Sequence, residues 1–204
     1  MTMKMKMTST MFKHLLCALL LFSCSAAFAQ EGQIRLPADT WQQLKTLTGI
    51  KSSGKPEDLV QLIVLFDANC PHCASLWSQI YGKESRHRNL ITLWAPVAYM
   101  GKDSPGKAVS LLRENSVQAL ATNFDNFDFG RRSGGAPVAE VTAAMRLSLE
   151  RNSNTWRKLT AATPLLIYKT ADGQVMAQVG LPPNARLDTL LHNLQGARLS
   201  NFGQ

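Results

Sequence analysis

The residues best suited to chemistry in this sequence are two closely spaced cysteines, Cys70 and Cys73. They stand in the stretch LIVLFDANCPHCASLW, residues 62–77, where an apolar run leads into Cys-Pro-His-Cys and an apolar segment follows. A Cys-x-x-Cys motif can bind a metal, close a structural disulfide or exchange electrons with other thiols. The rest of the chain must decide among these three chemistries.

Metal binding and a purely structural disulfide are both weakly supported. A structural zinc ion takes about four protein ligands, and the sequence has no second Cys-x-x-Cys and no His-x-x-x-His pair to complete such a set. His72 lies between the cysteines, and His87 and His192 are far along the chain. A disulfide that closes so short a loop restricts the unfolded chain little. We therefore predict no metal site and no cofactor.

The segments around the motif predict a strand, a helix and a second strand. Residues 60–68 (VQLIVLFDA) are apolar and rich in β-branched side chains, as in a buried strand. Pro71 suits the first turn of a helix, and Gly82 suits its end. Residues 89–100 (NLITLWAPVAYM) predict the next strand, so the order is that of a βαβ unit. One face of the helix is expected to carry Cys73, Leu76, Trp77 and Ile80.

This placement favours redox chemistry at the two cysteines. Cys70 precedes the helix, where free N–H groups and the helix dipole favour a negative charge. A thiolate there has a lowered pKa and is the reactive nucleophile. His72 beside it adds a positive charge or a hydrogen-bond donor, although an exposed loop histidine is the alternative. Cys73, one turn later on the buried face, is placed to resolve a mixed disulfide.

The N-terminus has the features of a secretory signal peptide over residues 1–29. Lysines precede the apolar run LLCALLLF, which is too short to span a bilayer, and no acidic residue occurs before Glu31. Ala27 and Ala29 form the A-x-A pattern that signal peptidase reads. We predict cleavage after Ala29 and export to a bacterial periplasm. The alternative is a lipoprotein signal in which Cys24 of LFSC is lipidated.

Removal of this segment changes the cysteine count and the charge. Cys17 and Cys24 leave, so Cys70 and Cys73 are the remaining cysteines. Three lysines and no acidic residue also leave, which lowers the formal net charge from +8 to +5. Because this excess is small and no lysine–arginine cluster interleaves with aromatic residues, it indicates a solvated basic surface. No nucleic-acid partner is predicted.

The remaining sequence suits one α/β domain with a helical insertion. The chain has 204 residues, 45% hydrophobic and 18% charged, which supports a packed core. Apolar residues at three-residue spacing within residues 34–50 predict a short leading helix. Residues 104–159 are predicted to be an all-helical insertion, with a start signal at Ser104 and Pro105 and a break at Gly134-Gly135.

The C-terminal part predicts a hairpin and a closing helix. Residues 165–169 and 174–179 read as two strands joined at Asp172-Gly173, a pair typical of tight hairpins. Residues 184–199 then form an amphipathic pattern that ends the fold. Its apolar side is expected to carry Leu187, Leu190, Leu191 and Leu194.

Four stretches give the chain a resemblance to a known family. They are VLFDANCPHC, LITLWAPVAYMGKDSPGKAVSLL, ATPLLIY and QVGLPPNARLDTLL, which together span about residues 60–195. With them the chain resembles the thioredoxin superfamily and, within it, the periplasmic disulfide isomerases of the DsbC/DsbG family, with the DsbG side closer. The resemblance implies a thioredoxin-like catalytic domain at 57–200. With the segments predicted above, the domain order is a signal peptide at 1–29, an N-terminal extension with a short helix at 30–56, and this domain with its helical insertion at about 104–159.

The resemblance also implies roles for individual residues. Cys70 would attack the substrate, and Cys73 would resolve the mixed disulfide. Pro164 would follow a cis peptide bond, with Thr163 before it, in a loop that faces the dithiol and docks substrate backbone. An ordinary turn before a strand is the alternative for this pair.

Two departures from the family pattern leave the direction of electron flow open. The dipeptide Pro71-His72, which would tune the redox potential, resembles that of the oxidase DsbA, whereas DsbG-like members usually carry Pro-Tyr. In addition, family isomerases have an N-terminal dimerisation domain, and the segment from Gln30 to Gly54 is too short for one. A monomer is therefore favoured.

Three functions follow as hypotheses. The first is a disulfide isomerase or reductase for exported proteins with cysteines, kept reduced by a membrane redox partner; a variant reduces sulfenic acids on single cysteines. The second is a DsbA-like dithiol oxidase. The third is a non-catalytic thioredoxin-like chaperone or assembly module. Arg131 and Arg132, beside the glycine-rich break, form either a solvated loop or part of a substrate rim.

Overall fold

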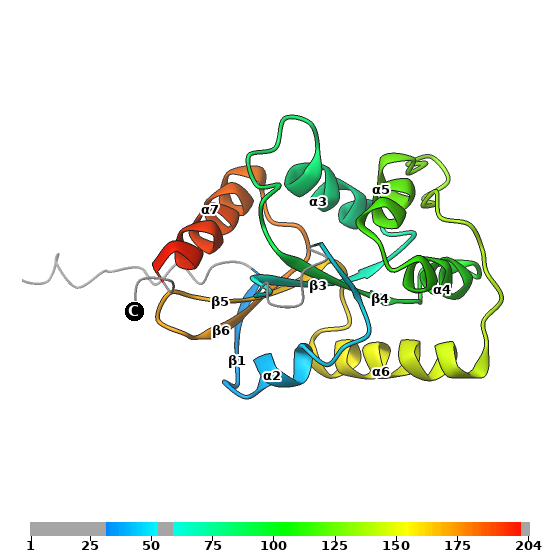
Figure 1. Ribbon diagram of the computed structural model, residues 1–204, viewed down its shortest axis with the longest axis horizontal. Coiled ribbons are helices and arrows are strands. Elements are labelled where there is room, and N and C mark those ends of the chain that lie inside the picture. Colours follow the sequence, from blue (N-terminus) through cyan, green and yellow to red (C-terminus); the bar gives the residue numbers. More distant parts are fainter. Residues whose placement is uncertain (1–31, 53–58, 201–204) are drawn as a thin grey trace, which may run out of the picture. The chain divides into compact units, whose positions relative to one another are not determined.

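The computed structural model describes residues 32–52 and 59–200, with the backbone alone for 195–200. These residues build one mixed six-stranded sheet with helices on both of its faces (Figure 1). The sheet order is β1-β6-β5-β3-β4-β2. The strands are β1 (Gln33–Leu36), β2 (Ile50–Lys51), β3 (Leu62–Asp67), β4 (Thr92–Val97), β5 (Leu165–Lys169) and β6 (Val175–Val179).

The centre of the sheet is a βαβ unit, as the sequence predicts. β3 and β4 pair in parallel, from Leu62 opposite Thr92 to Asp67 opposite Val97. α3 (Pro71–Tyr81) connects them. β5 pairs antiparallel with β3 on its other side, and the hairpin partner β6 follows it. β3 therefore lies in the interior of the sheet and all six of its residues are buried.

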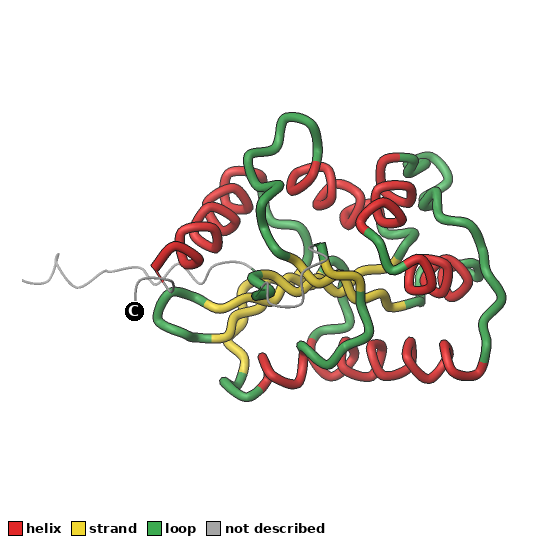
Figure 2. Tube along the Cα trace, viewed as in Figure 1, coloured by secondary structure: helices red, strands yellow, loops and turns green. Residues whose placement is uncertain are grey.

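Successive side chains of β3 point to opposite faces of the sheet and so contribute to two apolar cores, one on each face. Leu62, Val64 and Phe66 pack on the face covered by α3, α5 (Val117–Asp125) and α7 (Asn184–Ser200). Ile63 and Leu65 pack on the opposite face, covered by α2 (Thr40–Leu44) and α6 (Ala143–Leu159). Figure 2 shows the helices above and below the strands. Each face thus excludes water from the strand that carries the dithiol motif at its end.

Several predicted elements are confirmed, and the N-terminal one is shorter than predicted. The hairpin turns at Gly173, whose φ of 81° favours glycine. Leu187, Leu190, Leu191 and Leu194 of α7 are buried as predicted. The leading helix, however, ends at Leu44, because Ile50 joins β2 and pairs with Trp94. The sequence analysis also missed β1, which pairs antiparallel with β6.

The region between β4 and β5 is not all-helical, so that prediction is wrong in part. It contains α4 (Ser104–Glu114), α5 and α6, but residues 126–142 form no helix. α4 begins at the predicted Ser-Pro pair. α6 does not stand apart from the sheet, because Trp156 and Leu159 pack into the core of its second face. Residues 104–159 therefore include two of the helices that cover the sheet, α5 on one face and α6 on the other.

Some predictions lie outside the described residues. They are the signal peptide, its cleavage after Ala29, the alternative lipidation of Cys24 and part of the loop at residues 53–58. In the part of the chain that the structure describes, no helix is long and apolar enough to cross a membrane.

Candidate active site

Cys70 occupies the point where β3 gives way to α3. It is the N-cap residue of α3, with extended backbone (φ −85°, ψ 114°), and Pro71 takes the first helical turn. The Cys70 Sγ accepts a hydrogen bond from the backbone N–H of Cys73 at 3.3 Å. The sulfur thus replaces the oxygen of an ordinary capping side chain. A negative charge on it faces the positive end of the helix.

The two thiols are both buried, and they differ in acidity. A hydrogen bond from the Cys73 side chain lowers the pKa of Cys70 to about 7, against the opposing effect of burial, and the Thr163 side chain adds to the lowering. Burial, followed by the hydrogen bond to Cys70, raises the pKa of Cys73 well above 9.0. Cys70 keeps 2% of its surface exposed and Cys73 none. Both are free thiols, so the pair consists of a ready nucleophile and a protonated, buried partner.

The loop before β5 faces this dithiol. The Thr163–Pro164 peptide bond is cis. The Cys70 Sγ lies 3.6 Å from the carbonyl oxygen of Thr163, 93 residues away in sequence. Trp156 of α6 donates its indole N–H to the carbonyl of Ala162 at 2.7 Å, which fixes the loop from the side of the helix. Thr163, one of the two residues that the resemblance assigns to substrate docking, thus lies beside the sulfur of Cys70.

The other two residues predicted in the motif take different positions. Pro71 is partly buried, and its missing N–H loses no hydrogen bond at the first helical turn. His72 is exposed, and no hydrogen bond joins its ring to another described residue. Within the described ranges, no three side chains of the His, Cys, Asp or Glu type gather as metal ligands.

Tyr99 is a part of the site that sequence reasoning missed. Its hydroxyl lies 2.7 Å from the Thr163 Oγ1, and its ring centroid lies 4.5 Å from that of Trp156. The side chain is 48% exposed. In the sequence, Tyr99 reads as one more apolar residue near the end of a strand. Its contact with Thr163 spans 64 residues, which no local pattern reveals.

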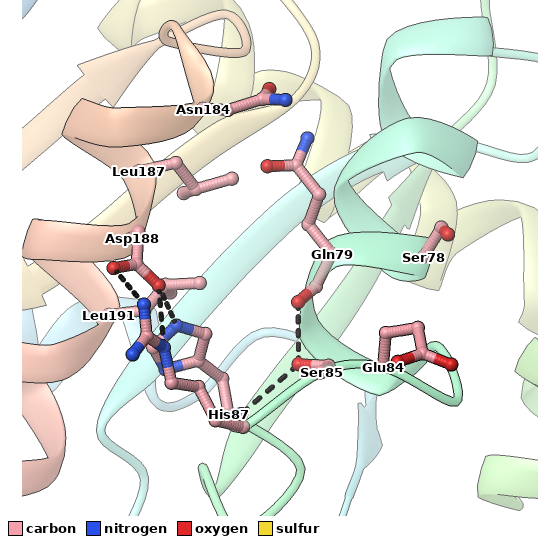
Figure 3. Close-up of a pocket in the computed structure, with 10 residues that line it drawn as sticks. Ser78, Gln79, Glu84, Ser85, His87, Asn184, Leu187, Asp188 and Leu191 are labelled. Carbon is pink, nitrogen blue, oxygen red and sulfur yellow. Dashed lines mark hydrogen bonds and ion pairs between the residues drawn. The ribbon is translucent and has the colours of Figure 1, made fainter.

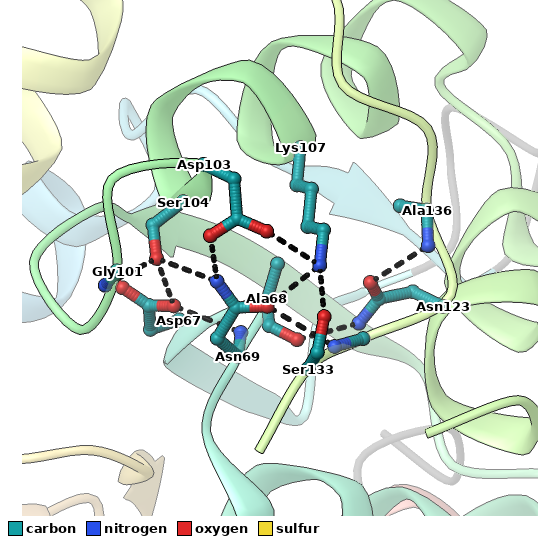
Figure 4. A network of polar contacts seen from close by, with 11 residues as sticks. Asp67, Ala68, Asn69, Gly101, Asp103, Ser104, Lys107, Asn123, Ser133 and Ala136 are labelled. Atoms are coloured by element: carbon teal, nitrogen blue, oxygen red, sulfur yellow. Dashed lines mark hydrogen bonds and ion pairs between the residues drawn. The ribbon is translucent and has the colours of Figure 1, made fainter. Parts of the chain in front are cut away.

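Asp67, the last residue of β3, organises the segment that carries Tyr99. It is fully buried, and each carboxylate oxygen accepts two hydrogen bonds. Figure 4 shows the contacts of Asp67 with Asn69 and Ser104. Oδ1 accepts from the backbone N–H of Asn69 and the hydroxyl of Ser104, both at 2.9 Å. Oδ2 accepts from the backbone N–H groups of Tyr99 at 2.7 Å and Met100 at 3.0 Å. Asp67 therefore joins the loop before Cys70 to the loop after β4.

A second polar cluster lies at the end of α3 away from Cys70. Asp188 of α7 accepts hydrogen bonds from Arg86 at 2.8 Å and pairs with the buried His87 at 2.8 Å (Figure 3). The hydrogen bond with His87, and then that with Arg86, lowers the pKa of Asp188. This cluster ties α7 to the loop after α3 and takes no part in the contacts of the dithiol.

The pKa asymmetry predicts the alkylation of the reduced protein as a function of pH. Since the pKa of Cys70 is about 7, its reaction with iodoacetamide should rise through neutral pH and level off at about one to two pH units above it. Cys73 should stay unmodified. Mass spectrometry of the digested protein measures both sites. In guanidinium chloride, as the control, both cysteines should react alike and only at higher pH; equal reactivity in the native protein would contradict the assignment.

Tyr99→Phe should raise the pKa of Cys70. A phenol is a better donor than an aliphatic hydroxyl, so Tyr99 donating to Thr163 leaves the Thr163 proton for the Cys70 thiolate. The variant keeps the ring against Trp156 and removes this donor, and alkylation of Cys70 below neutral pH should slow by about 2- to 5-fold. Tyr168→Phe is the matched control, because Tyr168 pairs with Leu62 at the far end of β3. A lowered pKa would mean that Thr163 donates to Tyr99 instead.

The sheet order, the helices on both faces and the dithiol at the start of the first crossover helix define a thioredoxin-like fold, as predicted. Solved structures of this fold match the chain. The catalytic domain of Proteus mirabilis ScsC has a TM-score of 0.53 and 17% identity, covering 77% of this chain and 96% of that one. A thioredoxin-like oxidoreductase from Silicibacter pomeroyi has a TM-score of 0.52 and 14% identity, covering 79% and 99%.

Among proteins of known sequence, the chain is similar to the thiol:disulfide interchange protein DsbG of Pseudomonas aeruginosa. The two are 28% identical over 162 residues, which are 76% of this chain and 60% of that protein. The chain thus spans about 60% of the length of this relative. No family model matches the chain. The predicted resemblance to DsbG is confirmed by this similarity.

Proposed function

We propose that the protein is a periplasmic thiol–disulfide oxidoreductase that isomerises or reduces disulfides in exported proteins through Cys70 and Cys73. The observation that carries the proposal is the asymmetry of the dithiol. Cys70 has a pKa of about 7 at the start of α3, and the thiol beside it is buried with a raised pKa. The similarity to DsbG supports the same chemistry.

The reaction begins with the Cys70 thiolate. It attacks one sulfur of a substrate disulfide, so that a Cys70–substrate disulfide forms and the second substrate sulfur leaves as a thiolate. In isomerisation, another substrate thiolate attacks the substrate sulfur of this mixed disulfide and releases Cys70 as a thiolate. In reduction, Cys73 loses its proton and attacks the Cys70 sulfur, which frees the reduced substrate and leaves a Cys70–Cys73 disulfide.

Substrate docking is assigned to Thr163 and Pro164. The Thr163 carbonyl lies beside the Cys70 sulfur, and the Pro164 carbonyl accepts a hydrogen bond from the backbone N–H of Gly180 at 2.9 Å, which holds the loop in place. A substrate segment that presents its cysteine to Cys70 therefore runs alongside this loop. Pro71 and His72, at the start of α3, are the positions assigned to tuning of the redox potential.

A DsbA-like oxidase is the second candidate, favoured by the Cys-Pro-His-Cys motif. The modest lowering of the Cys70 pKa weighs against it, because a strongly oxidising disulfide needs a much more stabilised thiolate. Thioredoxin has a nucleophile with a pKa of about 7, and the oxidase DsbA has one of about 3.5. Cys70, at about 7, lies with the reductive enzymes.

The test is the redox state of the two cysteines in living cells. Acid quenching, alkylation with a bulky maleimide and gel mobility separate the dithiol from the disulfide. We expect a mostly reduced pair, maintained by a membrane reductase. A mostly oxidised pair would contradict the isomerase or reductase assignment and favour the oxidase. N-terminal sequencing of the exported protein tests the proposed cleavage after Ala29, and light scattering tests the proposed monomer.

A further inference from the structure

A short turn beside the dithiol presents two adjacent arginines. An isolated β-bridge between Asp128 and Ser133 closes the turn, and Arg131 and Arg132 lie within it, both exposed. The arginines line a pocket of about 460 Å³ whose opposite wall includes Asn69, the residue before Cys70. Met100 and Gly101 of the same pocket directly follow Tyr99. The pocket therefore borders the candidate active site.

Buried hydrogen bonds hold this turn against the loop that carries Cys70 (Figure 4). The Asn69 Oδ1 accepts from the Lys107 Nζ at 2.9 Å and from the backbone N–H of Gly134 at 3.1 Å. Lys107 also donates to the Ser133 Oγ at 2.6 Å. A side chain at Gly134 would collide with the Ala68 carbonyl, so glycine permits this close approach. The backbone that carries the arginines is consequently held close to the loop before Cys70.

The charges around the pocket leave an excess of positive charge at its rim. The buried Lys107 is offset by Asp103, whose Oδ2 lies 2.9 Å from the Lys107 Nζ. Arg131 has a loose contact with Asp128, with 3.7 Å between its Nε and the Oδ2. Arg132 forms no ion pair with any carboxylate among the described residues. Asp103 also lines the pocket, but its charge is balanced by Lys107. The two arginines, opposed by Asp128, therefore leave a net positive charge for an anion that enters.

We propose that this pocket is a subsite for an acidic side chain of the protein substrate, close in sequence to the substrate's reacting cysteine. The proposal rests on the function proposed above. Consecutive Cα atoms are about 3.8 Å apart, so an Asp or Glu one to three residues from that cysteine spans the distance from Cys70 to the wall at Asn69. Guanidinium groups bind carboxylates through paired hydrogen bonds. The substrates selected are disulfides in acidic segments.

The experiment compares two peptides that share one internal disulfide and differ in the residues flanking its cysteines, Glu in one and Lys in the other. The reduced protein should exchange with the Glu peptide about tenfold faster at low salt, and high salt should shrink this ratio. R131E/R132E should invert the preference. The matched control is R146E/R151E, the same change of charge on exposed positions of α6, on the opposite face of the sheet. It should keep the wild-type ratio.

The outcomes separate the two proposals. Exchange with both peptides at equal rates would overturn the acidic subsite and leave the oxidoreductase assignment standing. Exchange with neither peptide would overturn the oxidoreductase assignment and the subsite with it. Loss of the preference in R146E/R151E as well would show that net charge, and not this pocket, sets it. Thermal unfolding checks that each variant is folded. If the double variant does not fold, R132Q replaces it and should lower the ratio of the Glu-peptide rate to the Lys-peptide rate by about threefold.

Discussion

Replacement of Cys70 by serine should reduce the rate of disulfide exchange by at least about 1,000-fold. A serine hydroxyl does not ionise at neutral pH, whereas the Cys70 thiol has a pKa of about 7. The measurement is the rate at which the reduced protein cleaves a disulfide-bonded peptide. Serine is close to cysteine in volume, and it caps a helix well, so the variant should fold normally.

Cys73→Ser is the matched control for this prediction. It retains the attacking thiolate and loses the resolving one, so it should accumulate a covalent complex between Cys70 and the substrate. Mass spectrometry detects the complex as an adduct of one protein and one peptide. A Cys70→Ser protein that retained exchange, or a Cys73→Ser protein that formed no adduct, would reverse or remove the assigned roles.

Asp67→Asn should lower the free energy of unfolding by about 2–4 kcal/mol. The carboxylate is fully buried, and donors occupy both of its oxygens. An amide offers one oxygen and one NH₂ group, so in either orientation its NH₂ faces two donors. Chemical denaturation measures the loss. The variant should also loosen Tyr99, whose backbone N–H is held by the Asp67 Oδ2.

Asp125→Asn is the control for this change. Asp125 is exposed and accepts one described hydrogen bond, from the indole N–H of Trp77 at 2.8 Å. An amide oxygen can accept the same bond, so the free energy of unfolding should change by no more than about 0.5 kcal/mol. If Asp67→Asn were as mild as Asp125→Asn, the four hydrogen bonds to Asp67 would not stabilise the fold as described.

The sequence predicted the elements whose signals are local. The strand before Cys70 is continuous in its apolar character, Pro71 marks the first helical turn, and the leucines of α7 recur at helical spacing. The sequence did not predict the edge strands β1 and β2. Each is short, and its strand conformation depends on pairing with a distant strand, β6 or β4. Ile50 belongs to a strand on account of its pairing with Trp94, although its spacing from Trp41 suits a helix.

The part of the site that lies in the Cys-x-x-Cys motif or in the stretches resembling the family could be predicted from the sequence. The dithiol and the Thr163–Pro164 pair were named in advance, and the structure places the Thr163 carbonyl beside the sulfur of Cys70. Asp67, Asn69 and Tyr99 were not, because their long-range partners lie 32 to 65 residues away. Lys107 was missed for another reason. A lysine in the first turns of a helix is usually solvated, and its burial depends on Asp103 and Asn69 together.

The complete burial of Cys73 has a consequence for timing. Its thiol has no exposed surface and a raised pKa, so the native packing must open locally before it can lose its proton and attack. Under the proposed function, a substrate joined to Cys70 by a disulfide would stay bound until that opening. During this time the substrate's own thiols would compete with Cys73 for the mixed disulfide. The burial of the Cys73 sulfur would then set the proportion of substrates that rearrange and that leave in reduced form, and a variant that admits water to Cys73 would favour release in reduced form.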